Sequence, residues 1–588
     1  MLLLVHILAA QLTAVSAVVL YGLARAARLP AGWLLAPAAA GLLWALATGP
    51  ADAVAGLLAG PTQVLDFLGG IPGHPERLRD LGAAWQGWQV WLPAQLPLAL
   101  VLGAGEAMIG VWLHRLHTDA WKLEPSRPGP LAVLRRLRNT RALRGGAVVT
   151  KDGAALGVVP ETGERAELSW REVRAGVLVV GAADSGKTTT GFQLLHAAIR
   201  RRRPAIVIDL AGSGRLAGWI EEACRDTGTP FQRFGPDGPA YYDPGKRANP
   251  ATRARLYTDM IDWRGSADQY RRSATAYLRD LFDVADAAPG DPRASSLDEA
   301  VHLLTPASLR ARADLVPDYH PERAALSERV RVALGVAADD RQSLAAVTEQ
   351  LREVHGSAYG RWLRPDPHVT DRTAPPDTEI DLDEVLARRG VVLFSLDTAV
   401  YGRPAALVAG LVAADVLERC AEVRRLGLDA DGLLWVDGCE ALRTATLTDL
   451  IGRGADAGLG AMLTTAALVA SQGSPVERLS ELAGTLIVHR VTDPASAERL
   501  ARLTGERPSV TETTPSVQPQ GAGPAAGQPV TPATAQPVLL RGPAVPPEDL
   551  QELSDGEFVL TVRSPKRRLL APVRTVGRES GRSPGQRS

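Results

Sequence analysis

Residues 176–190 read GVLVVGAADSGKTTT, and this stretch decides the fold of the chain. An apolar, β-branched run ends at Gly181, the pattern G-x-x-x-x-G-K-T then runs from Gly181 to Thr188, and a helical pattern follows directly. A strand, a glycine loop and a helix in this order are typical of the phosphate-binding P-loop. The two glycines let the backbone approach phosphates closely, and the loop amides point at them from a helix N-terminus. The stretch therefore predicts a nucleotide-binding α/β domain.

Every residue of this loop is a candidate for nucleotide binding. The candidates are Gly181, Ala182, Ala183, Asp184, Ser185, Gly186, Lys187, Thr188 and Thr189. We expect Lys187 to reach the β and γ phosphates and the Thr188 hydroxyl to ligate magnesium, so the expected cofactors are ATP and Mg²⁺. Lysine is scarce in this chain, because 60 of its 65 basic residues are arginine, and a chance match to the pattern is correspondingly rare.

A second magnesium ligand is expected from an aspartate at the end of another buried strand. The run GLLWVD ends at Asp437, but AIVID ends at Asp209 and GVVLFSLD ends at Asp397, so the strand pattern alone leaves three acids open. Two more strand-like runs, residues 459–465 and 485–490, follow further along the chain. Helical segments separate most of these runs, and this alternation predicts a parallel sheet buried between helices.

The first 123 residues predict a membrane anchor. Its three apolar runs are residues 2–23, 31–48 and 88–112. Each approaches or exceeds the roughly 17–25 residues that cross a bilayer. Arg25 and Arg28 follow the first run and further basic residues follow the third, so the positive-inside rule predicts the N-terminus outside and everything after about residue 113 inside. A cleaved signal peptide is the alternative for the first run, but no basic residue precedes its apolar core.

Composition narrows the remaining classes. The 65 basic and 65 acidic residues cancel, which excludes a globally basic coat for nucleic acid. The three cysteines cannot form a disulfide framework and lack the spacing of metal ligands. The periodicity is helical from residue 249 to about 376, and the chain is rich in Pro, Gly, Thr and Gln from 507 to 538.

These patterns predict seven parts in chain order. They are a membrane anchor (1–123), the start of the α/β nucleotide-binding domain (124–248), an all-α inserted domain (249–376), the remainder of the α/β domain (377–506), a disordered loop (507–538), a C-terminal β-hairpin of the core (539–572) and a basic disordered tail (573–588).

The order of the motifs resembles the VirD4/TraG/TraD class of conjugative coupling proteins, within the wider FtsK/HerA-like family of P-loop motors. The resemblance covers roughly residues 170–570. Besides the P-loop, it is carried by AIVIDLAGSGRLAGWI, GVVLFSLDTAVYGRPAALVAGLVAADVLE, GLLWVDGCEALRTATLTDLIGRGADAGLGAMLTTAALVASQ, GTLIVHRVTDPASAERLARLTGE and LSDGEFVLTV. It implies transmembrane helices followed by a RecA-like P-loop NTPase core with an inserted all-α domain, and it selects Asp437 as the acid that holds magnesium with Thr188.

The same resemblance implies partners and location. The implied partners are DNA or a relaxase–DNA complex bound without sequence preference, the membrane, the channel components of a type IV secretion system and further copies of the chain in a hexamer. The implied location is the bacterial cell membrane, crossed several times, with the ATPase domain in the cytoplasm.

Three positions depart from the family pattern. Gly438 follows Asp437 where the family has a glutamate that polarises water. Ala455 stands in place of the arginine that reaches a neighbouring subunit's nucleotide, and Ala466 stands in place of the glutamine that senses the γ phosphate. Glu440 and Arg453 are the nearest substitutes for the lost base and arginine, and an arginine finger alone can be worth about 10³–10⁵ in rate.

Three functions follow from these observations. The leading one is an ATP-hydrolysing coupling protein that recruits or translocates DNA or nucleoprotein to an export channel. The second, favoured by the three departures, is a non-hydrolysing nucleotide-binding scaffold or substrate receptor of the same system. The third, an FtsK-like DNA pump, is disfavoured because no winged-helix pattern follows residue 540 and because of the large helical insert.

Overall fold

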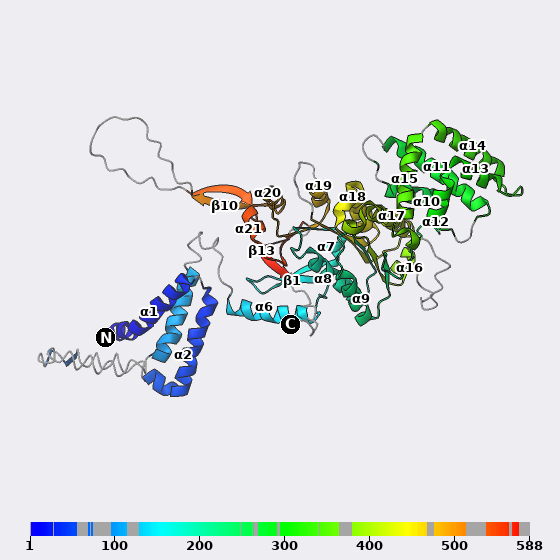
Figure 1. Cartoon of the computed structure of the whole chain (residues 1–588). Coiled ribbons are helices and arrows are strands. Elements are labelled where there is room, and N and C mark those ends of the chain that lie inside the picture. The colour runs from blue at the N-terminus through cyan, green and yellow to red at the C-terminus, as the bar shows by residue number, and fades with distance from the viewer. Residues whose placement is uncertain are drawn as a thin grey trace, which may run out of the picture. The chain divides into compact units, whose positions relative to one another are not determined.

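The computed structural model describes fifteen ranges of the chain. They are residues 2–27, 29–55, 69–70, 72–73, 96–113, 129–246, 248–261, 263, 268–290, 294–339, 341–363, 379–466, 475–512, 537–563 and 567–575. The chain forms two compact units, drawn in Figure 1. The first unit comprises Met1–Arg141 and Val158–Glu164, and the second comprises Ala142–Gly157 and Arg165–Ser588.

The described part of the first unit consists mainly of helices. They are α1 (Leu2–Ala26), the 3-10 turn η1 (Ala31–Leu34), α2 (Leu35–Thr48), a helix over Leu96–Leu113 and most of α6 (Pro130–Arg144). Ala31–Thr48 and Leu96–Leu113 are long and apolar enough to cross a membrane, and α1 has a shorter apolar stretch among its described side chains, Thr13–Ala26. Pro37 does not interrupt α2, because it lies in the first turn, where the helix needs no donor from its nitrogen.

Glycines bring these helices close together. A Cβ on Gly103 would lie 2.6 Å from the Ser16 Cβ, and a Cβ on Gly41 would lie 2.6 Å from the Pro97 carbonyl oxygen. Small residues at such contacts are typical of helix pairs inside membranes. The buried cluster of Ala24, Leu34, Ala107 and Val111 joins the end of α1, the start of α2 and the end of Leu96–Leu113. The three helices therefore alternate in direction.

A third helix of sufficient length and hydropathy, α17 (Thr398–Arg425), belongs to the second unit. Its apolar window is 67% buried inside the protein, against 17% for Ala31–Thr48 and 33% for Leu96–Leu113. Burial in the core therefore accounts for its composition.

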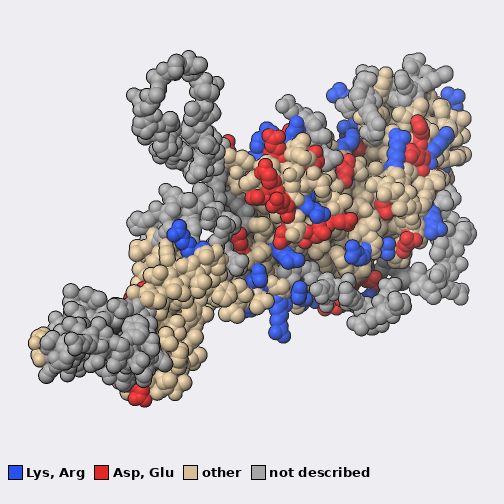
Figure 2. All heavy atoms as spheres, turned by 60° about the vertical axis from the view of Figure 1, so that its left-hand side comes forward, with Lys and Arg blue, Asp and Glu red and all other residues tan. Residues whose placement is uncertain are grey.

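In Figure 2, acidic and basic side chains are interspersed on the face shown.

The second unit contains a mixed sheet of eleven strands in the order β2-β1-β13-β12-β9-β3-β8-β7-β4-β6-β5. The strands are β1 (Gly153–Val158), β2 (Arg165–Ser169), β3 (Val177–Val180), β4 (Ala205–Asp209), β5 (Phe231–Phe234), β6 (Val391–Ser395), β7 (Gly432–Asp437), β8 (Leu459–Thr465), β9 (Thr485–His489), β12 (Glu557–Val562) and β13 (Arg567–Thr575). The seven from β9 to β5 are parallel, and β12 pairs antiparallel with both β9 and β13. The predicted parallel sheet is confirmed, although β6 ends at Ser395, two residues before Asp397, and β9 ends at His489.

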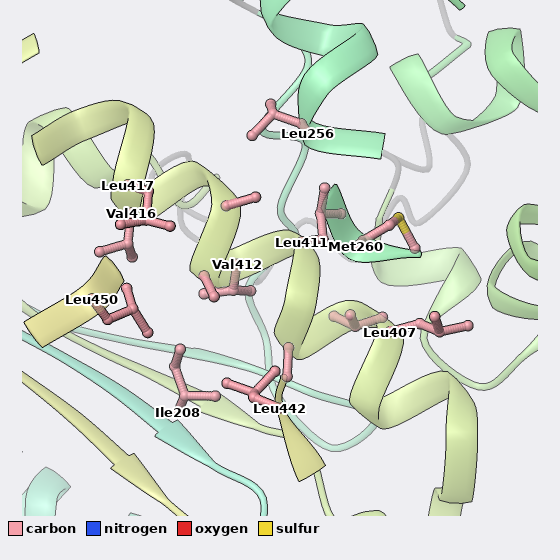
Figure 3. Close-up of a cluster of buried hydrophobic side chains, with 14 of the residues drawn as sticks. Ile208, Leu256, Met260, Leu407, Leu411, Val412, Val416, Leu417, Leu442 and Leu450 are labelled. Atoms are coloured by element: carbon pink, nitrogen blue, oxygen red, sulfur yellow. The ribbon is translucent and has the colours of Figure 1, made fainter. Parts of the chain in front are cut away.

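Helices cover both faces of this sheet. They include α7 (Trp170–Arg174), α8 (Lys187–Arg200), α9 (Leu216–Thr227), α16 (Leu382–Ala387), α18 (Thr444–Asp456), α19 (Pro475–Leu482) and α20 (Pro494–Leu503). Helices α8 and α9 contact each other, and so do α17 and α18. Right-handed crossovers place the first pair and the second pair on opposite faces. In Figure 3, Val412 and Val416 of α17 lie in one buried cluster with Leu450 of α18 and Ile208 of β4.

Between β5 and β6 the described residues from 250 to 363 form helices only. These are α10 (Pro250–Met260), α11 (Asp268–Ala287), α12 (Ser296–Leu303), α13 (Pro306–Asp314), α14 (Arg323–Asp339), α15 (Arg341–Gly356) and the 3-10 turn η4 (Gly360–Trp362). Helix α10 packs on α17, so the helical segment shares its core with the sheet and belongs to the same compact unit. Residues 364–378 of the predicted insertion lie outside the described residues.

The C-terminal predictions need correction. Strands β10 (Glu506–Glu512) and β11 (Pro537–Pro543) pair antiparallel, so both ends of the loop predicted for 507–538 are strands, and residues 513–536 lie outside the described residues. The Pro-rich composition suggests that water solvates the backbone N–H and C=O groups at the loop ends. In the structure these groups pair with each other between β10 and β11. Helix α21 (Pro547–Glu552) occupies part of the hairpin predicted for 539–572, and the β12–β13 hairpin extends to Thr575, into the predicted tail.

Candidate functional site

The glycine loop lies between β3 and α8. Gly186 has φ +103 and immediately precedes Lys187, the first residue of α8. A Cβ on Gly181 would lie 2.6 Å from the His489 Cβ, and a Cβ on Gly186 would lie 2.8 Å from the Gly556 Cα. Asp184 also takes a left-handed backbone, φ 55, in the middle of the loop. Both glycines are therefore required by close approach of the chain, as well as by the turn.

The Lys187 ammonium group closes the loop. Its Nζ donates to the carbonyl oxygens of Gly181 and Ala182, at 2.9 and 2.6 Å. Burial lowers its pKa, and the nearby charges of Asp437, Glu440 and Asp184 act in the opposite direction. A phosphate in the loop would offer Lys187 charged acceptors, which are stronger than these neutral carbonyls.

The magnesium ligands predicted from the sequence are in contact. Thr188 Oγ1 donates to Asp437 Oδ2 across 3.0 Å, and the Asp437 side chain is almost completely buried. Asp437 is the last residue of β7, in register with Thr464 of β8. A hydroxyl and a carboxylate are the oxygen ligands that Mg²⁺ uses beside nucleotide phosphates, so the donor set fits this ion. Among the described residues, no group of three or more His, Cys, Asp or Glu could hold a metal.

The structure distinguishes the three acids that the strand pattern left open. Asp397 caps α17 by accepting the N–H groups of Ala399 and Val400. Asp209 is in register with Asp437, and its carboxylate accepts the Gly212 N–H at 3.0 Å. Of the three, only Asp437 has a P-loop hydroxyl as a hydrogen-bond partner among the described contacts.

Burial raises the pKa of both adjacent carboxyl groups. The pKa of Asp437 rises to about 6, and that of Asp209 rises to about 7 because the Asp437 charge adds to burial. The Asp437 charge therefore favours the neutral form of Asp209. Of the two carboxyl groups, Asp437 is the one that contacts the Thr188 hydroxyl.

A pocket of about 510 Å³ opens over the loop. It is lined by Ala183, Asp184, Gly186, Lys187, Thr188, Thr189, Ala211, Ser213, Gly214, Arg215, Trp219, Asp437, Gly438, Glu440 and Ala466. It thus combines most of the predicted nucleotide-binding residues with Asp437 and Glu440. Gly181, Ala182 and Ser185 do not line it: Gly181 and Ala182 accept hydrogen bonds from Lys187, and Ser185 bonds back to the Ala182 carbonyl.

The backbone at Gly438 disfavours the glutamate that the resemblance leads us to expect at this position. Gly438 has φ +78, and a Cβ there would lie 3.0 Å from the Ala211 nitrogen. The chain then forms the 3-10 turn η5 (Cys439–Ala441), which exposes Glu440 on the pocket wall. Ala466, where the resemblance leads us to expect a glutamine, also lines the pocket.

Arg453 does not reach this pocket. Its guanidinium donates to the Leu417 carbonyl at 3.0 Å, on the side of α18 that faces α17. The sequence analysis missed Arg215 and Trp219, which line the pocket from the start of α9. The Arg215 guanidinium carbon lies 6.0 Å from the centre of the Trp219 ring, and within the described residues no hydrogen bond or ion pair holds this guanidinium group. The sequence signal was the glycine-rich segment LAGSGRLAGW, residues 210–219, which follows Asp209 directly.

The C-terminal hairpin supports the loop from below. The Gly556 N–H donates to the Ser185 carbonyl at 2.9 Å, and Thr575 N–H donates to the Gly556 carbonyl at 2.7 Å. His489 Nε2 shares a hydrogen bond of 3.1 Å with Thr190 Oγ1 on α8. Burial lowers the pKa of His489 to about 4, so the imidazole is neutral under the P-loop. Sequence patterns gave no sign of this contact.

Comparisons with solved structures find similar chains. The bacterial conjugative coupling protein TrwBdeltaN70, in its unbound monoclinic form, is 15% identical with a TM-score of 0.48, over 74% of this chain and 90% of that chain. The structural likeness is to conjugative coupling proteins. The plasmid coupling protein TrwB in complex with ADP and Mg²⁺ is 16% identical with a TM-score of 0.44, over 73% of this chain and 91% of that one.

A further solved structure is also similar. VirB4 of Thermoanaerobacter pseudethanolicus is 13% identical with a TM-score of 0.42, over 73% of this chain and 97% of that chain. No family model and no curated protein sequence matches the chain.

Proposed function

We propose that this chain is a membrane-anchored ATPase that couples DNA or nucleoprotein to the export channel of a conjugation or type IV secretion system. The observation that carries the nucleotide part is the convergence of Lys187, Thr188 and Asp437 on one pocket, with the hydroxyl and carboxylate 3.0 Å apart. The coupling part rests on the order of the motifs that resemble the VirD4/TraG/TraD class.

The residues of the pocket divide the work of ATP binding and hydrolysis. Thr188 and Asp437 would hold Mg²⁺, which would neutralise charge on the phosphates when bound. Lys187 would bind the β and γ phosphates, and the loop amides would surround them. Glu440, exposed on the pocket wall, is placed to orient water and accept its proton in the absence of a glutamate at 438.

Arg215 is the arginine that this pocket itself supplies. It lines the wall formed by the loop after β4, the strand next to Asp437. A guanidinium there would stabilise charge that develops on the terminal phosphate, which is the part an arginine finger plays. Arg453 would serve this purpose only if it left the Leu417 carbonyl and reached the nucleotide of a neighbouring subunit in a hexamer.

The helices of the first unit would anchor the chain in the membrane. The end of α1, the start of α2 and the end of Leu96–Leu113 meet in one buried cluster, so Arg25, in the last turn of α1, would lie on the same side of the bilayer as the end of Leu96–Leu113. In the sequence, Arg28 follows α1 and further basic residues follow position 113. With the positive-inside rule, that side is the cytoplasm and the N-terminus is outside.

A second function, a non-hydrolysing nucleotide-binding scaffold or substrate receptor, is favoured by Gly438 and Ala466. Both line the pocket where the related family has catalytic side chains. Steady-state phosphate release with and without DNA, beside Lys187→Ala, separates the two functions. Turnover that Lys187→Ala abolishes supports the ATPase, whereas nucleotide binding without turnover above that variant supports the scaffold.

DNA binding and assembly have their own tests. Binding directed at phosphates predicts affinity that falls steeply with salt and depends little on base sequence. Electron micrographs of the detergent-solubilised protein with DNA and a non-hydrolysable ATP analogue should show hexameric rings. Monomers under all conditions would contradict the ring-forming motor.

A further inference from the structure

Helix α6 combines arginines with exposed leucines. Its fifteen residues, PLAVLRRLRNTRALR, carry five arginines and no acid. Leu131, Leu134 and Leu137 are exposed by 71%, 63% and 59%. Leucines at a spacing of three residues lie on one side of a helix, so their exposure is a property of one face.

The opposite face of α6 is the packed one. Asn139 Nδ2 donates to the Gly163 carbonyl at 2.8 Å, and a Cβ on Gly163 would lie 2.4 Å from the Ala132 carbonyl and 2.6 Å from the Arg136 nitrogen. Arg135 pairs with Glu164 of the same loop. The loop over residues 158–164 therefore holds one side of α6, and the leucine face points away from it.

Arginines accompany the leucines on the open side. Arg138 and Arg141 are exposed, and both lie within one turn of Leu134 or Leu137. Water is a poor environment for three leucines. A surface that is only acidic would pair with the arginines but would leave the leucines in water. A surface that is anionic outside and apolar beneath would satisfy both kinds of side chain.

The start of α6 lies at the end of the apolar helices. A Cβ on Gly129 would lie 3.6 Å from the Pro30 Cγ, and a Cβ on Gly32 would lie 3.4 Å from the Pro130 Cδ. Pro30 and Gly32 belong to the connection between α1 and α2, where both apolar helices end. If those helices cross the bilayer, α6 begins at the level of the lipid headgroups.

We propose that α6 lies on the cytoplasmic surface of the membrane and binds anionic phospholipids, with Leu131, Leu134 and Leu137 among the upper acyl chains and its arginines on the headgroup phosphates. Polybasic segments next to a transmembrane helix gain affinity from each cation close to an anionic leaflet. The proposal rests on the membrane anchoring inferred above. It assigns α6 a lipid-binding role that the nucleotide site does not require.

The test uses the full-length protein with an environment-sensitive fluorophore on Leu134→Cys. Leu428→Cys is the matched control, because Leu428 is a leucine with nearly equal exposure, 60%, in the second unit. The native cysteines Cys224, Cys420 and Cys439 are buried, so they should not take up the probe in the folded protein. The protein is placed in nanodiscs of phosphatidylcholine alone or mixed with phosphatidylglycerol, with a quencher attached to the lipid chains.

With phosphatidylglycerol present, we expect quenching at position 134 about twofold or more above that at position 428. Arg138→Gln with Arg141→Gln should shift α6 about 25-fold toward the undocked state, while ATP binding stays unchanged. Equal quenching at positions 134 and 428 would overturn the proposal. So would quenching at position 134 that stays the same without phosphatidylglycerol and after substitution of both arginines. Protection of position 134 in detergent that grows with protein concentration would overturn it too, in favour of a contact between copies.

Failure of the anchoring itself would look different. A chain that carbonate washing releases from membranes is not anchored, and the proposed location then fails together with the lipid contact. A chain that stays in the bilayer while position 134 remains in water contradicts the α6 proposal alone.

Discussion

The Thr188 hydroxyl donates to the Asp437 carboxylate across 3.0 Å, although 249 residues separate them in the chain. The contact exists because β7 and β3 flank β8 in the parallel sheet, so their C-terminal ends meet at one edge. Ligands bind at this edge in open α/β sheets. The helical segment between β5 and β6 lengthens the loop that separates the two residues in sequence without separating them in space.

Thr188→Val should remove the magnesium-dependent part of nucleotide affinity. Valine keeps the shape of threonine but has no oxygen to offer a cation or Asp437. We expect ATP affinity in the presence of Mg²⁺ to fall about tenfold or more, with little change in EDTA, measured by titration of a fluorescent nucleotide. Thr188→Ser retains the hydroxyl and should bind like the wild type. Equal losses in EDTA and in Mg²⁺ would show that Thr188 does not act through the ion.

Glu440→Gln and Gly438→Glu test which position supplies the base. Removing the Glu440 carboxylate should lower turnover by about 10²–10⁴ and leave nucleotide affinity near that of the wild type. Gly438→Glu restores the family residue but imposes a side chain at φ +78, which costs about 1–2 kcal/mol, with a Cβ close to the Ala211 nitrogen. We expect a lower melting temperature and no gain in turnover.

The phosphate-release assay decides between these outcomes. Turnover that rises in Gly438→Glu would mean that the backbone adapts and that the chain is a disabled member of the family. Turnover that is unchanged in Glu440→Gln would remove Glu440 from the reaction.

The sequence predicted the part of the site that depends on local pattern. The P-loop between β3 and α8, the strand ending at Asp437 and the buried strands all carry their signal within a few adjacent residues. Apolar periodicity and glycine spacing are local properties, so they can be recognised in the sequence without knowledge of the fold. The choice of Asp437 over Asp209 and Asp397 also required the order of the motifs along the chain.

Contacts between distant segments were not predictable in this way. Arg215 reaches the pocket because β4 lies beside β7, and His489 lies under the loop because β9 lies beside β3. Gly191 is another example, since a Cβ there would lie 2.5 Å from the Trp435 ring. Strands β1 and β2 also escaped prediction, because their short runs, GAALGV and RAELS, carry little hydrophobic pattern.

Mixtures of variant subunits should show whether the arginine that acts on a nucleotide comes from the same subunit or from a neighbouring one. If Arg215 acts within its own pocket, mixtures of Arg215→Ala with Lys187→Ala contain no complete site, and their turnover should stay about 10³-fold below the wild type. If Arg453 instead acts across a subunit interface, mixtures of Arg453→Ala with Lys187→Ala should recover turnover, because one subunit contributes Lys187 and its neighbour contributes Arg453.

Phosphate release from such mixtures is the measurement, with each variant alone as the control. Recovery in the Arg215→Ala mixture would contradict a role within its own pocket. Wild-type turnover in Arg215→Ala alone would exclude any role of this arginine in the reaction.

His489 should make the protein less stable as the pH falls below about 6.5. Burial lowers its pKa from 6.5 to about 4, so between these values the unfolded chain binds a proton that the folded chain does not. The stabilising effect is complete above pH 6.5 and is lost toward pH 4. At pH 5.5 the loss is on the order of 1 kcal/mol.

His489→Gln isolates this contribution, because glutamine can still offer a hydrogen bond to Thr190 and does not titrate. The comparison is needed because Asp209 and Asp437 act in the opposite sense: their raised pKa values mean that the folded state takes up protons that the unfolded state releases, which stabilises it as the pH falls. We expect the apparent melting temperature to fall by about one to two degrees more in the wild type than in His489→Gln between pH 7.5 and 5.5, because a free-energy change of this size shifts the melting temperature of a large unit only slightly. Parallel pH profiles for the two proteins would show that the imidazole under the P-loop takes up its proton as readily in the folded chain as in the unfolded one.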